Sequence, residues 1–126
     1  MNKARVGTRK CKLGEVIAER ELTAVVDGKT VRVQVRIGKP FAAKEGEFLC
    51  PYQIIGIGIT GIGNGPVRAI AGLDSMQALY LTLQFIGSML KHDQRTMKIR
   101  WNSDTNLGLP SLNMRNQPEP RRGGIG

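Results

Sequence analysis

The stretch from Phe48 to Leu90 constrains the fold most, because four structural signals follow one another there without a break. An extended segment, 48–55, is followed by a glycine-rich turn, a second extended segment, 67–71, and a helix that begins at about Ser75. Glycines and a proline between two extended segments favour a flexible hairpin loop. Residues 48–90 therefore predict two neighbouring antiparallel strands and one helix.

A second hairpin is predicted before this stretch. Val31, Val33, Val35 and Ile37 alternate with polar residues, as in a strand with one buried face. The segment 16–26 precedes it, and Asp27-Gly28 between them is a strong two-residue turn signal. In that register Glu19 faces Arg36, Glu21 faces Gln34, and Leu22 meets Val33 on the core side.

The same register places Arg20 on the core side, where an unpaired charge is costly. We expect a shifted register, with a bulge or a strand end at this position. The alternatives are an inward charge that protects an exposed sheet edge from pairing with other chains, and an arginine that binds a ligand.

The helix should run from about Ser75 to Leu90. Asp74 and Gln77 resemble a capping box at its start, and Lys91 and His92 suit its negative C-terminal end. Two apolar stripes follow the helix, which is more apolar surface than one sheet can cover. The first stripe contains Met76, Leu79, Tyr80, Leu83, Ile86 and Leu90, and the second contains Ala78, Leu81, Phe85 and Met89.

Charge is concentrated toward the ends of the chain. The chain has 126 residues, with 19 Lys and Arg against 10 Asp and Glu, and a formal net charge of +9. We interpret 1–12 as a basic flexible segment, 13–109 as a single domain and 110–126 as a disordered basic tail. Basic tails favour encounters with anionic partners such as nucleic acid.

Isolated motifs do not assemble into a predicted active site. The pattern from Gly56 to Gly61 matches a dinucleotide fingerprint, but a strand rather than a helix follows it. Cys50 between apolar residues is typical of an inert core thiol, and His92, the single histidine, has no neighbouring cluster of metal ligands. Asp74 is explained as a helix cap and Arg68 as a structural strand residue. We expect no enzyme, no cofactor and no metal.

Two cysteines without a metal-binding or redox spacing favour a reduced cytoplasm. No apolar run has the length of a signal peptide core or a membrane span. We therefore expect a cytoplasmic protein without a membrane anchor.

Several motifs resemble a family of small bacterial domains of unknown function. The similarity lies in a strand that reads Cys50-Pro51-Tyr52-Gln53-Ile54, the helix start Gly72-Leu73-Asp74-Ser75-Met76-Gln77-Ala78-Leu79, and Ile86-Gly87 near the helix end. The resemblance covers roughly residues 13–110, supports the domain boundaries and transfers no catalytic residue.

The sequence therefore predicts an α+β fold with a four- to five-stranded, mainly antiparallel sheet and one helix before a last strand at 97–101. The preferred function is a protein-binding or assembly domain, most simply a homodimer, with Ala78, Leu81, Phe85 and Met89 as its contact face. The alternative is a nucleic-acid accessory protein. Its phosphate contacts would be Lys3, Arg5, Arg9, Lys10, Lys12, Arg121 and Arg122.

Overall fold

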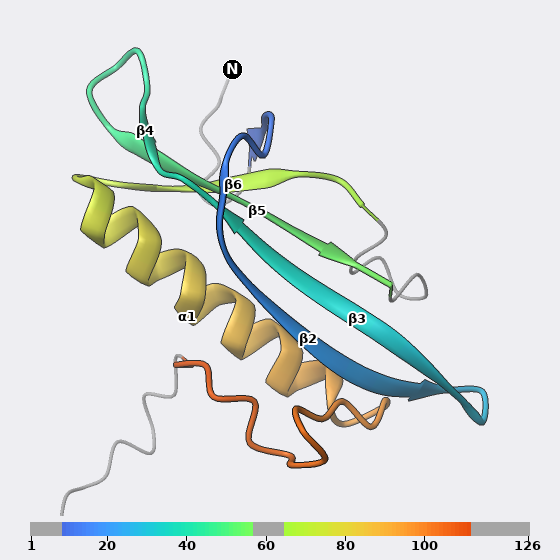
Figure 1. Ribbon diagram of the computed structural model, residues 1–126. Helices are drawn as coiled ribbons and strands as arrows, with labels where there is room; N and C mark the ends of the chain where they lie inside the picture. The colour runs from blue at the N-terminus through green and yellow to red at the C-terminus, as the bar shows by residue number, and fades with distance from the viewer. Residues whose placement is uncertain (1–8, 57–64, 112–126) are drawn as a thin grey trace, which may run out of the picture.

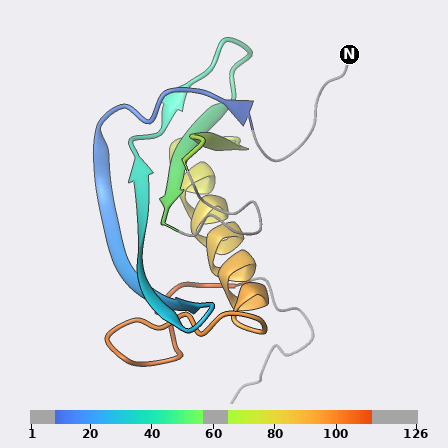
Figure 2. The same cartoon turned by 90° about the vertical axis from the view of Figure 1, so that its right-hand side faces the viewer.

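A computed structural model describes residues 9–56 and 65–111 and shows an α+β fold of two layers. The elements are β1 (Arg9–Lys10), β2 (Val16–Val26), β3 (Lys29–Gly38), β4 (Phe41–Ala42), β5 (Phe48–Ile55), β6 (Arg68–Gly72) and α1 (Ser75–Asp93). The twisted sheet is one layer and α1 lies across one of its faces (Figure 1). Figure 2 shows the two layers from the side.

The sheet is antiparallel at every pairing. Its order is β1-β6-β5-β3-β2, and β4 pairs with β5 off this path. The predicted β2–β3 register is confirmed: Glu19 pairs with Arg36, Glu21 with Gln34 and Leu22 with Val33. The turn residues Asp27 and Gly28 both have positive φ, 53° and 78°, as a two-residue hairpin turn requires.

The core lies between α1 and the inner face of the sheet. Every second residue of the strands contributes to it, as a pleated strand requires. Its buried residues from the sheet are Leu22, Ala24, Val33, Val35, Ile37, Cys50, Tyr52, Ile54 and Ile70, and those from α1 and beyond are Ala78, Ile86, Leu90, Met97, Ile99 and Leu107.

Two short strands appear where the sequence predicted none. Arg9–Lys10 forms β1 beside β6, although residues 1–12 were expected to be a flexible segment, and residues 1–8 lie outside the described part. Phe41–Ala42 forms β4 within the expected loop 40–47. The connection from β1 to β2 crosses the sheet face opposite α1. There Gly38 is required, because a side chain would collide with the Leu13 carbonyl oxygen.

The predicted last strand at 97–101 was wrong. Arg100 alone pairs with the sheet, exchanging two backbone hydrogen bonds with Thr23 of β2 at 2.9 and 2.8 Å. The Ile99 amide instead donates to Met97 O at 3.0 Å, and Ile99 O accepts from Gln94 Nε2 at 2.9 Å. These local bonds curl the chain, so that Met97 and Ile99 enter the core without forming a ladder.

Candidate functional site

The N-terminus of α1 is capped as the sequence predicts. Asp74 has extended backbone angles, and its Oδ1 accepts a hydrogen bond from the Gln77 amide at 2.8 Å. The Gln77 side chain reaches back, and its Oε1 accepts from the Leu73 amide at 2.7 Å. These bonds satisfy amides that a helix start otherwise leaves unpaired, so Asp74 acts as a structural carboxylate.

The face of α1 that meets the sheet runs between the two predicted stripes. Ala78, Thr82, Ile86 and Leu90, spaced four residues apart, are all fully buried. The assignment of Ala78 to an exposed contact face was therefore wrong. Leu81 and Met89 of the same predicted face are only partly buried and pack against the core.

Phe85 is the most exposed member of the predicted contact face, at 36%. Its ring also contacts the Tyr52 ring of β5, with centroids 6.1 Å apart and a tilt of 58°. This geometry is typical of a stabilising aromatic pair. Phe85 thus belongs partly to the interior, and the protein contacts of Leu81, Phe85 and Met89 stay a prediction.

The most exposed apolar side chains lie at the other flank of α1, near its N-terminus. Leu73 is 82% exposed, Met76 76% and Tyr80 52%. We call these three residues the N-terminal patch. Met76 and Tyr80 are four residues apart and so share one side of the helix. The sequence analysis had placed Met76 and Tyr80 in the first stripe, outside the predicted contact face.

Charge is sparse in this part of the molecule, where the exposed carboxylate of Asp74 beside Leu73 is the nearest charged group in the chain. Residues 75–90 contain no Asp, Glu, Lys, Arg or His, although the chain is 23% charged. The polar neighbours of the patch on α1 are the amides of Gln77 and Gln84, and Gln84 Nε2 donates to the Tyr80 hydroxyl at 3.1 Å. The exposed flank with Met76 and Tyr80 is thus apolar, with the amides of Gln77 and Gln84 and the carboxylate of Asp74 at its border.

Both thiols are poor nucleophiles at neutral pH. Cys50 is fully buried, and burial raises the pKa of its thiol more than the interaction with the Thr82 side chain lowers it. The charge of a nearby Cys11 thiolate also raises it. Burial raises the pKa of Cys11 as well. Because the thiolate is the reactive form, this environment is that of a core cysteine.

Arg20 keeps its predicted position opposite Val35, and the shifted register expected there was wrong. The bulge in β2 lies between Val16 and Ala18 instead. The Arg20 guanidinium lies 3.7 Å from the ring centroid of Trp101 and donates hydrogen bonds to Leu107 O at 2.8 Å and Gly108 O at 3.2 Å. Arg20 therefore anchors the segment that follows α1.

Most residues of the nucleic-acid hypothesis lie outside the described residues. These are Lys3, Arg5, Arg121 and Arg122; Arg9 and Lys10 belong to β1, and Lys12 is exposed. The folded part adds a cationic stretch that the sequence analysis did not single out. Lys91, Arg95, Lys98 and Arg100 are all exposed, within ten residues at and beyond the C-terminal end of α1. The four Lys and Arg residues between positions 91 and 100 could have indicated this stretch in the sequence.

The C-terminal end of α1 holds a carboxylate in an unfavourable place. Asp93 is the last helical residue, and within the described part of the chain its Oδ2 is buried without a hydrogen-bond partner. Burial raises the pKa of the Asp93 carboxyl, and the neighbouring His92 offsets this in part. A negative charge at this end also opposes the helix dipole.

The glycine-rich loop connects β5 and β6, as the sequence predicts, and residues 57–64 within it lie outside the described residues. Its ends are joined, since Gln53 Nε2 donates to Gly65 O at 2.8 Å. A strand follows the loop, so the context of a dinucleotide fingerprint is absent. Among the residues that the structure describes, no three His, Cys, Asp or Glu side chains gather as a metal site would require.

These features define a single-helix α+β domain with an exposed apolar patch and a cationic C-terminal stretch. The chain belongs to the family described as domain of unknown function DUF6968, whose model matches residues 18–111. Comparison with curated proteins and with solved structures gives no match. Within residues 9–56 and 65–111, no helix has both the length and the apolar character needed to cross a bilayer.

Proposed function

We propose that this chain is a non-enzymatic assembly domain that forms a homodimer through the N-terminal patch of α1. The observation that carries the proposal is the N-terminal patch, where three large apolar side chains are more than half exposed. Exposed apolar groups bordered by polar ones are typical of protein interaction sites.

A second copy of the chain is the partner that fits the charge distribution. Two molecules with a net charge of +9 repel each other over most approaches. Residues 75–90 carry no charge, so two copies that meet along them bring together only the Asp74 carboxylates, each of which already accepts a hydrogen bond from the Gln77 amide. A two-fold axis would place Met76 and Tyr80 of each copy against the same residues of the other.

The size of the patch sets the expected strength. One helix half presents less surface than the roughly 800 Å² per partner of a standard stable interface. We therefore expect a dimer that dissociates in the micromolar range. The amides of Gln77 and Gln84 would border it with hydrogen bonds.

The proposal is tested by adding one charge to the patch. Met76→Glu would place the carboxylates of the two copies close together in the two-fold contact, which should prevent dimer formation. The variant should still fold, because Met76 is 76% exposed in the single chain. Thr30→Glu, at an exposed position of the β2–β3 hairpin, adds the same charge elsewhere and should dimerise as the wild type does. Light scattering during size-exclusion chromatography reads the mass.

The outcome that contradicts the proposal is equal masses for the two variants at every concentration. Phe85→Glu is a less direct test, since it also removes the contact with the Tyr52 ring. A lower melting temperature of Phe85→Glu would mix loss of packing with loss of association.

The cationic stretch favours a second candidate function, the binding of nucleic acid. Four exposed bases at 91–100 would add phosphate contacts to those of the basic ends of the chain. A fluorescent random-sequence RNA or DNA should then bind with an affinity that falls steeply with salt. The double variant Arg95→Gln, Lys98→Gln should reduce the slope of log K against log salt by about 2. An unchanged slope would remove this stretch from the binding surface.

A further inference from the structure

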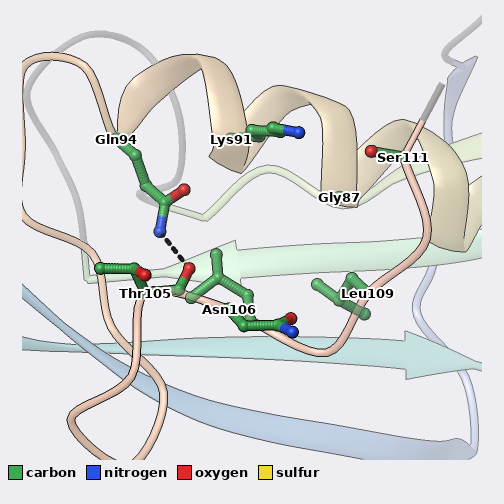
Figure 3. A pocket seen from close by; sticks show the side chains of 8 residues that line it. Gly87, Lys91, Gln94, Thr105, Asn106, Leu109 and Ser111 are labelled. Atoms are coloured by element: carbon green, nitrogen blue, oxygen red, sulfur yellow. Dashed lines mark hydrogen bonds between the residues drawn. The ribbon is translucent and has the colours of Figure 1, made fainter. Parts of the chain in front are cut away.

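A cavity of about 420 Å³ lies at the other end of α1, away from the N-terminal patch. Gly87, Lys91 and Gln94 of α1 and its cap form one side, and residues between Thr105 and Ser111 form the other (Figure 3). Cavities of about 300–1,000 Å³ are the usual size of small-molecule sites. The position is separate from the surface assigned to dimer formation above.

The walls of this cavity are held in place by hydrogen bonds that do not involve any ligand. Gln94 Nε2 donates to Ile99 O at 2.9 Å and to Thr105 O at 2.8 Å. Asn106 Oδ1 accepts from the Gly108 amide at 2.9 Å. Arg20 holds the Leu107 carbonyl from the opposite side. A site with such fixed walls binds a ligand at a lower cost in ordering.

The close approach of the two sides depends on Gly87. A Cβ atom at this position would collide with the Pro110 carbonyl oxygen, so any other residue would push the segment away from the helix. The segment that follows α1 therefore runs back along the helix, as Figure 1 shows for the orange and red part of the chain.

Three hydrogen-bond donors in the cavity are not used by the fold. These are the Lys91 ammonium, the Asn106 Nδ2 and the Ser111 hydroxyl, none of which has a hydrogen-bond partner within the described part of the chain. Figure 3 shows Lys91 on the helix side between Gln94 and Ser111. Among residues 9–56 and 65–111, no Asp or Glu lines the cavity. This donor set is complementary to a carboxylate, whose oxygens only accept.

An apolar floor accompanies the donors. Leu107, which is buried, and Leu109 line the cavity together with Gly87. We propose that this cavity binds a small organic carboxylate with a short aliphatic body, with Lys91 as the partner of the carboxylate and Leu107 and Leu109 around the body.

The test is a titration of the full chain followed by amide chemical shifts, with hexanoate as the probe. Hexanoate should shift the amides of Gly87, Lys91 and Asn106 in a saturable way. Hexanamide has the same body without the charge, and acetate has the charge without the body, so both should bind more weakly. Lys91→Gln should weaken hexanoate about fivefold. Lys39→Gln, at an exposed position far along the chain, should leave it unchanged.

Three results would overturn the proposal. Equal affinity for hexanoate and hexanamide would show that the charge is not recognised, and equal affinity for hexanoate and acetate would show the same of the aliphatic body. Tighter binding of inorganic phosphate than of hexanoate would assign the cavity to a different anion. The dimer proposal is tested separately, because Lys91→Gln should leave the sedimentation of the protein unchanged.

Discussion

Arg20 should be the most important single polar residue for the stability of the C-terminal part of the domain. Removing its side chain in Arg20→Ala loses the stacking on Trp101, worth about 1 kcal/mol at a partly exposed site. It also loses charged hydrogen bonds to Leu107 O and Gly108 O, which contribute about 1.5–3 kcal/mol together. We therefore expect the free energy of unfolding to fall by about 3 kcal/mol.

The assay is urea unfolding followed by tryptophan fluorescence, since Trp101 is the only tryptophan and lies in the contact itself. A loss of about 3 kcal/mol should lower the urea midpoint by about 1.5–2 M for a domain of this size. Emission of the folded variant should also change, because the guanidinium no longer covers the indole ring.

Arg32→Ala on the neighbouring strand is the matched control. Arg32 also makes a short contact, 2.7 Å to Glu21, but both side chains are more than half exposed. Such a pair contributes at most about 1 kcal/mol. If Arg20→Ala lowers the midpoint no more than Arg32→Ala does, the role of Arg20 as an anchor is refuted.

Three further substitutions or reactions test other parts of the structure. Asp93→Asn should raise the melting temperature at pH 7 by about 2 °C. Because the pKa of Asp93 is raised in the folded state, its charge lowers stability as pH rises through that pKa, so the melting temperatures of the variant and the wild type should become equal near pH 3. A difference between the two that does not depend on pH would contradict this. Ser103→Gly should stabilise the protein by up to about 1 kcal/mol in urea unfolding, because Asn102 and Ser103 form a turn with φ of 52° and 68°, and a loss of stability would refute this strain. Cys50 should react with iodoacetamide at the rate of unfolding, whereas the partly exposed Cys11 should react first, and rapid labelling of Cys50 in the folded state, measured by peptide mass, would contradict its burial.

The sheet could be predicted from the sequence because its signals are local. Alternating valines and the Asp27-Gly28 turn determine the β2–β3 register without reference to the rest of the chain. The cap formed by Asp74 and Gln77 is equally local. Interactions of this kind are complete within a few residues, so the pattern alone is sufficient.

The errors concern residues whose partners are distant in sequence. Arg20 is accommodated by Trp101 and by carbonyls 87 and 88 residues away, which no local pattern indicates. The periodicity of α1 likewise does not say which flank meets the sheet. Thr82 can lie at the centre of the buried face because its hydroxyl donates a hydrogen bond to Ala78 O at 2.7 Å. An apolar periodicity does not include a threonine in the buried face.

The cavity could not have been predicted from the sequence for the same reason. It forms because the segment after α1 turns back and contacts Gly87, and that path depends on Arg20 and Gln94 together. The donors that line it, Lys91 and Asn106, are 15 positions apart and belong to no recognisable motif.

The central claim, that the N-terminal patch of α1 joins two copies of this chain, is tested most directly by sedimentation equilibrium of the wild-type protein. Measurements from low to high micromolar concentration should show the mass rising from one chain toward two, and the Met76→Glu variant should keep the mass of one chain throughout. A wild-type mass of one chain at high micromolar concentration would contradict the claim.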